Sequence, residues 1–376
     1  MDFRLNEEQQ QLADSIQKYF AKDYGFEQRK AILASASGTS AEVWATLADM
    51  GVMAVSLPEA AGGFGGGVLD LMSAMQAVGD CALVEPLSTT LIAARLLIAS
   101  EAHTAVLESV ADGSTKLAWA HGEPLSRYSL THISTSAKAN ASGYALNGSK
   151  SVVLHAPLAD RLVVTVRTSG SANDAAGLSL MLVDPRAAGV TLKTYRTVDN
   201  LRAADVEFKN VQVASDALIG AEGKALATIE EAADFANALL CAEAVGAMRS
   251  ANASTLDYLK TRKQFGQPIG AFQALQHRMV EMTIHAEQAS SMALMACTKV
   301  DACSKGQITA AERARYVSAA KVKVADAARI VGQEAIQLHG GMGLTQEMKI
   351  AHTFKRLTMI AQQFGDADFH LARFAA

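Results

Sequence analysis

Hydrophobic residues in the first 115 positions recur at the spacing of amphipathic helices. Leu12, Ile16 and Phe20 form one such series, with an apolar residue every fourth position. This period places apolar side chains on one helical face and predicts a helical domain over residues 1–115. Residues 56–67 (SLPEAAGGFGGG) interrupt the pattern with five glycines and one proline, so we expect a surface loop there.

At Lys116 the hydrophobic period shortens to about two, and β-branched residues become frequent. Asn147-Gly148 carries the sequence signal of a type I′ β-hairpin turn. Turn-length spacings separate the further strand patterns, so residues 116–222 predict a compact antiparallel barrel or sandwich. These patterns cover residues 162–166, 178–183, 190–195 and 206–213.

From residue 223 onward the helical period returns and persists to the C-terminus. Thr309 and Glu312 have the spacing of a capping box at the start of one of these helices. Long helices joined by short turns predict an antiparallel four-helix bundle over residues 223–376, and the whole chain is predicted to be α+β. The helical patterns cover residues 224–261, 272–304, 309–338 and 345–362, with a short helix after 366.

Composition narrows the class of protein. The 376 residues are 50% hydrophobic and 19% charged with a formal net charge of −4, which disfavours a nucleic-acid partner. The longest apolar run, residues 91–99, contains Arg95 and is too short to span a membrane. The four cysteines lack CxxC spacing, so neither a metal site nor disulfides are indicated. The N-terminus lacks an obvious targeting pattern, and we expect a cytoplasmic protein.

Residues 258–276 (YLKTRKQFGQPIGAFQALQ) contain a basic corner between two predicted helices. Arg262 offers a planar fork of hydrogen-bond donors, and Gln264 and Gln273 offer neutral donors, so the corner is suited to phosphate. A helix C-terminal cap followed by a solvated turn explains the same residues on helix physics alone.

Two segments resemble acyl-CoA dehydrogenases. They are residues 262–266 (RKQFG), followed by Gln273, and residues 337–343 (QLHGGMG). The resemblance implies a flavoprotein that binds FAD and desaturates an acyl-CoA thioester, passing electrons to an external acceptor. It also implies that one set of residues contacts the FAD of an adjacent subunit: Arg262, Gln264, Phe265, Gln273, Gln337 and Gly341.

The flavin contacts that the resemblance implies in the β domain are less complete. Family members read roughly Tyr/Phe-x-x-Thr-Glu-Pro where this chain has residues 119–124 (WAHGEP). Their Trp-Ile-Thr-Asn falls on residues 152–155 (VVLH), where Leu154 lacks the threonine hydroxyl.

Neither usual position of the family's catalytic base holds a carboxylate, because Phe364 and Ala236 stand there. Glu243 is the remaining candidate on the first bundle helix, although it could equally pair with Arg249 or a neighbouring helix. Two further carboxylates lie near the C-terminus, where Asp366 is also placed to cap a helix and Asp368 to face solvent.

The C-terminal residues 365–375 (GDADFHLARFA) resemble the small subunits of two-chain α2β2 acyl-CoA dehydrogenases of the pimeloyl-CoA and steroid side-chain types. This resemblance implies an oxidoreductase subunit of fatty acid or steroid catabolism whose larger homologous partner carries the glutamate. Two alternatives stay open. One is a self-sufficient homotetramer with a displaced carboxylate, and the other is a non-catalytic scaffold on the same fold.

Overall fold

The computed structural model describes residues 7–376, and its contacts divide the chain into two compact units. Among the described residues, one unit contains residues 7–31, 68–83 and 237–376, and the other contains residues 32–67 and 84–236. The predicted helical character of the first third is confirmed. Its helices are α1 (Glu7–Asp23), α2 (Phe26–Ala34), α3 (Ala41–Asp49), α4 (Val68–Cys81), α5 (Leu87–Leu97) and α6 (Thr104–Ala111).

The glycine-rich loop is tied to the chain that precedes it. Phe64 N–H donates to the Ala54 carbonyl at 3.0 Å, and Gly65 N–H donates to the Leu57 carbonyl at 2.9 Å. A Cβ on Gly63 would lie 2.1 Å from the Leu57 carbonyl oxygen, so this close return requires glycine. The segment is therefore an ordered loop with its own backbone pairing.

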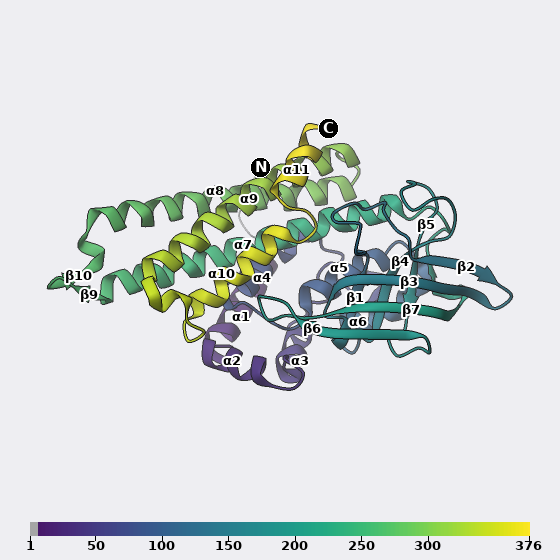
Figure 1. The fold of residues 1–376 in the computed structure, drawn as a ribbon, viewed down its shortest axis with the longest axis horizontal. Helices are drawn as coiled ribbons and strands as arrows, with labels where there is room; N and C mark the ends of the chain where they lie inside the picture. Colours follow the sequence, from purple (N-terminus) through teal and green to yellow (C-terminus); the bar gives the residue numbers. More distant parts are fainter. Residues whose placement is uncertain (1–6) are drawn as a thin grey trace. The chain divides into compact units, whose positions relative to one another are not determined.

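The middle of the chain forms one eight-stranded sheet in the order β6-β7-β3-β2-β4-β5-β8, with β1 pairing β4 (Figure 1). Most neighbours are antiparallel, but β1 and β2 each pair β4 in parallel. Alternate residues along the strands form two apolar clusters on the two sheet faces, one of which includes α5 and α6. The strands are β1 (Leu117–Ala120), β2 (Ser136–Asn140), β3 (Gly143–Leu154), β4 (Arg161–Arg167), β5 (Leu178–Val183), β6 (Val190–Arg196), β7 (Arg202–Ala214) and β8 (Leu218–Ile219).

The predicted hairpin turn at Asn147-Gly148 is wrong. Both residues lie inside β3, at a register shift between Leu146 and Gly148, and the β2–β3 turn comes earlier, after Asn140. A Cβ on Gly148 would lie 2.6 Å from Thr135 Cα, so the glycine permits a close strand approach at a bulge. Asn147-Gly148 therefore forms a bulge within β3, because the turn that reverses the chain lies between β2 and β3.

The C-terminal helices match the predicted ranges closely. Thr309 and Glu312 form the predicted capping box, and Asp366 caps the last helix by accepting from Phe369 N–H. Figure 1 shows the long helices running along one another. They are α7 (Leu226–Thr261), α8 (Gln273–Ser304), α9 (Ala310–His339), α10 (Lys349–Gln362) and α11 (Ala367–Ala375).

Helix α4 belongs to the same compact unit as most of this bundle. A Cβ on Gly79 would lie 1.8 Å from the Glu243 carbonyl oxygen, and a Cβ on Gly246 would lie 1.8 Å from the Gln76 carbonyl oxygen. The backbones of α4 and α7 therefore touch directly at two glycines. Asp301 of α8 accepts hydrogen bonds from the N–H groups of Val68 and Leu69, which fixes the start of α4.

Candidate functional site

The basic corner is a short β-hairpin, formed by β9 (Lys263–Gln264) and β10 (Gln267–Pro268). Phe265 and Gly266 are its central residues, with φ of 54° and 81°, as a type I′ turn requires. Arg262 lies just beyond the end of α7, and its carbonyl accepts from Ile269 N–H at 2.8 Å, which closes the base of the hairpin.

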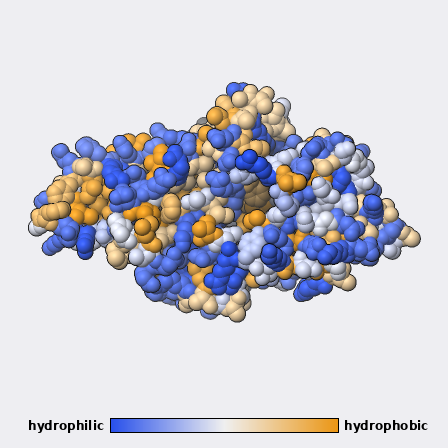
Figure 2. Space-filling view, in the orientation of Figure 1, coloured by the Kyte–Doolittle hydropathy of each residue, from blue (hydrophilic) through white to orange (hydrophobic). Residues whose placement is uncertain are grey.

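The corner's functional side chains point away from their own chain. Phe265 is 90% exposed, and Arg262, Gln264 and Gln273 are exposed as well. Within residues 7–376, the Arg262 guanidinium makes no ion pair. Figure 2 shows hydrophobic atoms among hydrophilic ones around this hairpin. An exposed aromatic beside an uncompensated cation is suited to receive a partner or a ligand.

The second predicted segment follows the end of α9. Gln337 is exposed on the last turn of α9, and Gly340 has φ of 60°, a conformation that favours glycine. A Cβ on Gly341 would meet nothing within 4 Å, so packing within this chain does not explain the glycine there. The open space beside Gly341 fits the close approach of an external group.

His339 has a structural role in this part of the fold. Its Nδ1 lies 2.8 Å from the Ala335 carbonyl oxygen, and its ring stacks on Tyr258 of α7 with centroids 4.5 Å apart. Burial lowers the pKa of the imidazole, which keeps it neutral. The stack joins the end of α9 to the end of α7, from which the hairpin projects.

Phe364 occupies a turn held by donors from other helices. Its φ is 54°, and its carbonyl oxygen lies 3.0 Å from His370 Nε2 and 3.4 Å from Asn237 Nδ2. The fully buried Lys321 of α9 donates to the carbonyls of Ile360 and Gln363 at 2.8 and 2.6 Å. Backbone carbonyls that α10 leaves without helical partners are thus satisfied by side chains. The turn is rigid, but it carries no carboxylate at 364.

Glu243 is engaged in a buried ion pair. Its two carboxylate oxygens accept from Arg356 Nε at 2.5 Å and from Arg356 Nη2 at 2.9 Å. The partner is therefore Arg356 of α10, whereas Arg249 binds Gln76 and Ser290. Both carboxylate oxygens are thus engaged by the buried guanidinium, and neither is turned toward a substrate. Asp366 is occupied as a helix cap, and Asp368 is exposed.

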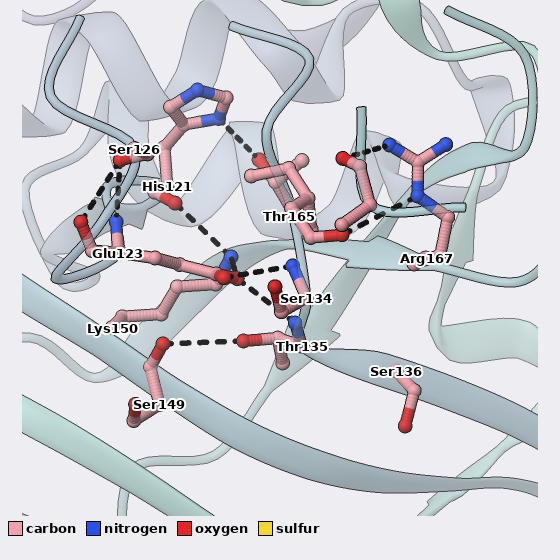
Figure 3. Close-up of polar contacts among 12 residues, drawn as sticks. His121, Glu123, Ser126, Ser134, Thr135, Ser136, Ser149, Lys150, Thr165 and Arg167 are labelled. Atoms are coloured by element: carbon pink, nitrogen blue, oxygen red, sulfur yellow. Dashed lines mark hydrogen bonds and ion pairs between the residues drawn. The ribbon is translucent and has the colours of Figure 1, made fainter. Parts of the chain in front are cut away.

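The β domain contains a buried polar network at the segments that resemble flavin contacts (Figure 3). Lys150 Nζ lies 2.8 Å from Glu123 Oε1 and donates to the His121 carbonyl at 3.0 Å. Glu123 also accepts from the N–H groups of Ser134 and Thr135. Burial opposes ionisation of Glu123, but Lys150 and these hydrogen bonds lower its pKa overall.

This network joins the two segments directly. Ser151 N–H donates to the Gly122 carbonyl at 2.8 Å, and His121 Nδ1 lies 3.0 Å from Thr165 Oγ1. Burial, reinforced by nearby Lys150, lowers the pKa of His121 to about 3, so its ring is neutral. His121 Nε2 is a buried nitrogen without a hydrogen-bond partner among the described residues. The backbone around these segments is fixed although their side chains differ from the family pattern.

Within residues 7–376, no group of three or more His, Cys, Asp and Glu side chains is placed to hold a metal ion. No helix in the same range has the length and apolar character needed to cross a membrane.

The domain order and these segments are those of one family. Its models match the chain as acyl-CoA dehydrogenase N-terminal domain (residues 6–114), middle domain (118–211) and C-terminal domain (224–376). The chain belongs to the acyl-CoA dehydrogenase family of oxidoreductases, which confirms the resemblance and the fold class. The predicted domain bounds of 1–115, 116–222 and 223–376 stay a prediction.

Three relatives illustrate the similarity. The chain is 31% identical to the acyl-CoA dehydrogenase FadE12 of Mycobacterium tuberculosis over 370 residues, covering 96% of this chain and 93% of FadE12. A solved structure of the Tcur3481–Tcur3483 steroid ACAD has a TM-score of 0.84 at 26% identity, covering 98% of this chain and 97% of that chain. The structure of PigA with FAD and proline has a TM-score of 0.88 at 26% identity, covering 100% of this chain and 98% of that chain.

Sequence reasoning missed the groups that hold the candidate site in place. Lys321 sits in a helical register that gives no sign of burial, and Arg356 lies 113 residues from Glu243. Lys150 lies in the run Asn-Gly-Ser-Lys-Ser (147–151), which has no apolar alternation to indicate that its amine faces the sheet interior.

Proposed function

We propose that this chain is the base-lacking subunit of a two-chain, FAD-dependent acyl-CoA dehydrogenase. Its substrate is an acyl-CoA thioester, and its partner is a larger homologue that supplies the catalytic glutamate. The similarity to the Tcur3481–Tcur3483 ACAD, a pair of differently named chains, supports the assembly. We further propose that the two chains form an α2β2 tetramer in the cytoplasm and that the reduced flavin passes its electrons to an external acceptor.

The engagement of Glu243 and Asp366, two of the three candidate carboxylates, carries this proposal, and the third, Asp368, is exposed to solvent. Glu243 is bound bidentately by Arg356, Asp366 caps α11, and Phe364 fills the position where the family's base is expected. Removal of the α-proton of a thioester requires a carboxylate with a free lone pair within reach. This chain offers none at those positions, so the proton acceptor comes from another polypeptide. The ion pair also argues against a homotetramer that uses Glu243.

FAD is the cofactor of the proposed enzyme, and the exposed residues fit it. Arg262 supplies forked donors for a pyrophosphate, Gln264 and Gln273 supply neutral donors, and Gly341 leaves space for close backbone approach. PigA, at 26% identity, has been solved with FAD. When bound, FAD would supply the acceptor for the hydride that leaves the β-carbon. The bundle corner of this chain binds and orients, whereas the partner moves the proton.

Co-expression with a larger homologue that carries the glutamate tests the proposal. We expect a complex with flavin absorbance, a native mass of a tetramer, and acyl-CoA-dependent dye reduction. Replacing the partner's glutamate by glutamine lowers kcat by about 10³-fold or more, whereas Asp368→Asn in this chain leaves kcat within about twofold.

Glu243→Gln in this chain separates the two enzyme hypotheses. Loss of turnover in a variant that still assembles and folds would favour a displaced base. Flavin and turnover from the wild-type chain purified alone would reject the subunit proposal. Absence of both flavin and turnover in the complex would favour the scaffold.

A further inference from the structure

Val152 has a backbone conformation that β-branched residues rarely adopt. Its φ is 53°, it lies inside β3, and its side chain is 52% exposed. Left-handed backbone at such a residue costs about 1–3 kcal/mol and persists only where surrounding structure enforces it. Burial of the valine does not account for the strain.

A β-bulge places Val152 there. The β3–β7 register passes from Lys150–Val206 to Val153–Ala204, so two residues of β3 face Asp205 alone. An extra residue in one strand bends that strand and leaves a local backbone group without its ladder partner.

Asp205 and Tyr195 hold the bulge. Asp205 Oδ1 accepts from Val152 N–H at 3.1 Å and from the Tyr195 hydroxyl at 2.8 Å. Burial and this bond raise the pKa of Tyr195 to about 12, so its hydroxyl stays a donor at neutral pH. One carboxylate oxygen thus replaces the missing strand partner and is itself oriented by a phenol.

The bulge lies where β3 has a free edge. Strand β2 pairs with residues 143–147 of β3, whereas β7 follows the other edge as far as Leu154. Beyond the Ser151 bond to Gly122, no strand within residues 7–376 pairs with this second edge at 152–154. A Cβ on Gly122 would meet only the Ser151 carbonyl, at 3.6 Å, so packing does not require the neighbouring glycine.

We propose that Asp205 and Tyr195 are positioning residues that hold the strained Val152 bulge and thereby set the free edge of β3 to receive a flavin ring. The rim of an isoalloxazine alternates carbonyls with ring nitrogens and can pair with a strand edge in the way a further strand does. Backbone groups of residues 152–154 then replace side-chain contacts that Leu154 and Gly122 cannot make. This proposal rests on FAD binding to this chain and not on the missing base.

The test compares four single variants and one double variant of the full chain, purified with its partner when co-expressed. Asp205→Ala removes the acceptor, Tyr195→Phe removes its orienting donor, and Val152→Gly removes the strain. Tyr144→Phe is the matched control, because Tyr144 lies on β3 of the same sheet and its hydroxyl donates to a carboxylate, that of Glu222, at 3.0 Å. Measurements are FAD bound per copy of this chain, FAD dissociation constant, flavin absorbance maxima, and urea unfolding.

We expect Asp205→Ala to weaken FAD binding about tenfold and to shift the flavin absorbance, with a smaller effect of Tyr195→Phe and none of Tyr144→Phe. Adding Val152→Gly to Asp205→Ala restores binding, because glycine adopts the bulge without strain. Unchanged binding and absorbance in folded Asp205→Ala and Tyr195→Phe would overturn the proposal, as would failure of the Val152→Gly rescue. A complex with one flavin per pair of chains would also overturn it, whereas the missing-base proposal would survive that result.

Discussion

At the scale of single residues, two buried lysines donate to backbone carbonyls that have no partner in a helix or a sheet. Lys321 donates to the final carbonyls of α10, and Lys150 donates to the His121 carbonyl while pairing with Glu123. An ammonium in an apolar interior is unfavourable unless its protons are used. Both amines are fully buried, so each fixes a turn that an exposed lysine could not fix.

Lys321 makes stability depend on pH in a defined direction. Burial lowers its pKa to about 8 from the ordinary 10.5, so between these values the unfolded chain binds more protons than the folded one. The wild type should therefore gain stability relative to Lys321→Met as pH rises from 8 to 10.5, by up to about 3 kcal/mol. Urea unfolding at pH 7.5, 9 and 10 measures the difference.

Lys305→Met, which removes an exposed lysine at the end of α8, controls for the loss of one positive charge. If the difference in unfolding free energy between wild type and Lys321→Met did not change across this pH range, the lowered pKa of the buried Lys321 amine would be wrong.

Helix caps and buried ion pairs differ in how far the sequence alone predicts them. Thr309, Glu312 and Asp366 were predictable as caps because the physics of a helix end is local. Glu243 and Arg356 were not predictable as partners, since their pairing depends on how α7 meets α10. Phe364 and the basic corner were found by resemblance, and their roles stay predictions.

At the scale of elements, helix ranges followed from the 3.6-residue period, whereas the sheet did not follow from the two-residue period alone. The dipeptide Asn-Gly occurs both in β-bulges and in hairpin turns. Only the register of β3 against its neighbouring strands shows that Asn147-Gly148 forms a bulge here. Parallel pairing of β1 and β2 with β4 arises from long connections that carry no local signal.

The crossing of α4 and α7 makes a sharp prediction about helix packing. Gly246→Ala would place a Cβ 1.8 Å from the Gln76 carbonyl oxygen, which forces two backbones apart. We expect a loss of about 3 kcal/mol or more in unfolding free energy, despite alanine's better helix propensity. Chemical denaturation measures it.

Gly332→Ala is the matched control, since its Cβ would meet side chains and no backbone: the Phe354 ring at 3.1 Å, which can move, and Leu357 Cδ1 at 3.7 Å. Equal effects of the two substitutions would show that propensity, not helix separation, governs both positions.

At the scale of the whole molecule, the exposed hairpin is the feature that its own chain does not explain. Arg262→Ala should weaken FAD retention by the assembled enzyme about tenfold, because the guanidinium then no longer grips a phosphate. Arg262→Lys should recover only part of this, since an ammonium lacks the planar fork. Flavin absorbance after gel filtration measures both.

Lys263→Ala, an exposed cation on β9, is the neighbouring control with the same change of charge. If it lowered FAD retention as much as Arg262→Ala, general electrostatic attraction would replace the proposed specific grip.

The direct backbone contact between α4 and α7 also limits how the protein can be taken apart. Residues 68–83 fold in one unit with residues 237–376, although about 150 positions separate them in the chain. A gene fragment encoding only the C-terminal helices would expose the surface of α7 that α4 covers. Chimeras between relatives should therefore exchange α4 together with the bundle. Gly79 of α4 and Gly246 of α7 then stay packed against the helix backbones that they contact here.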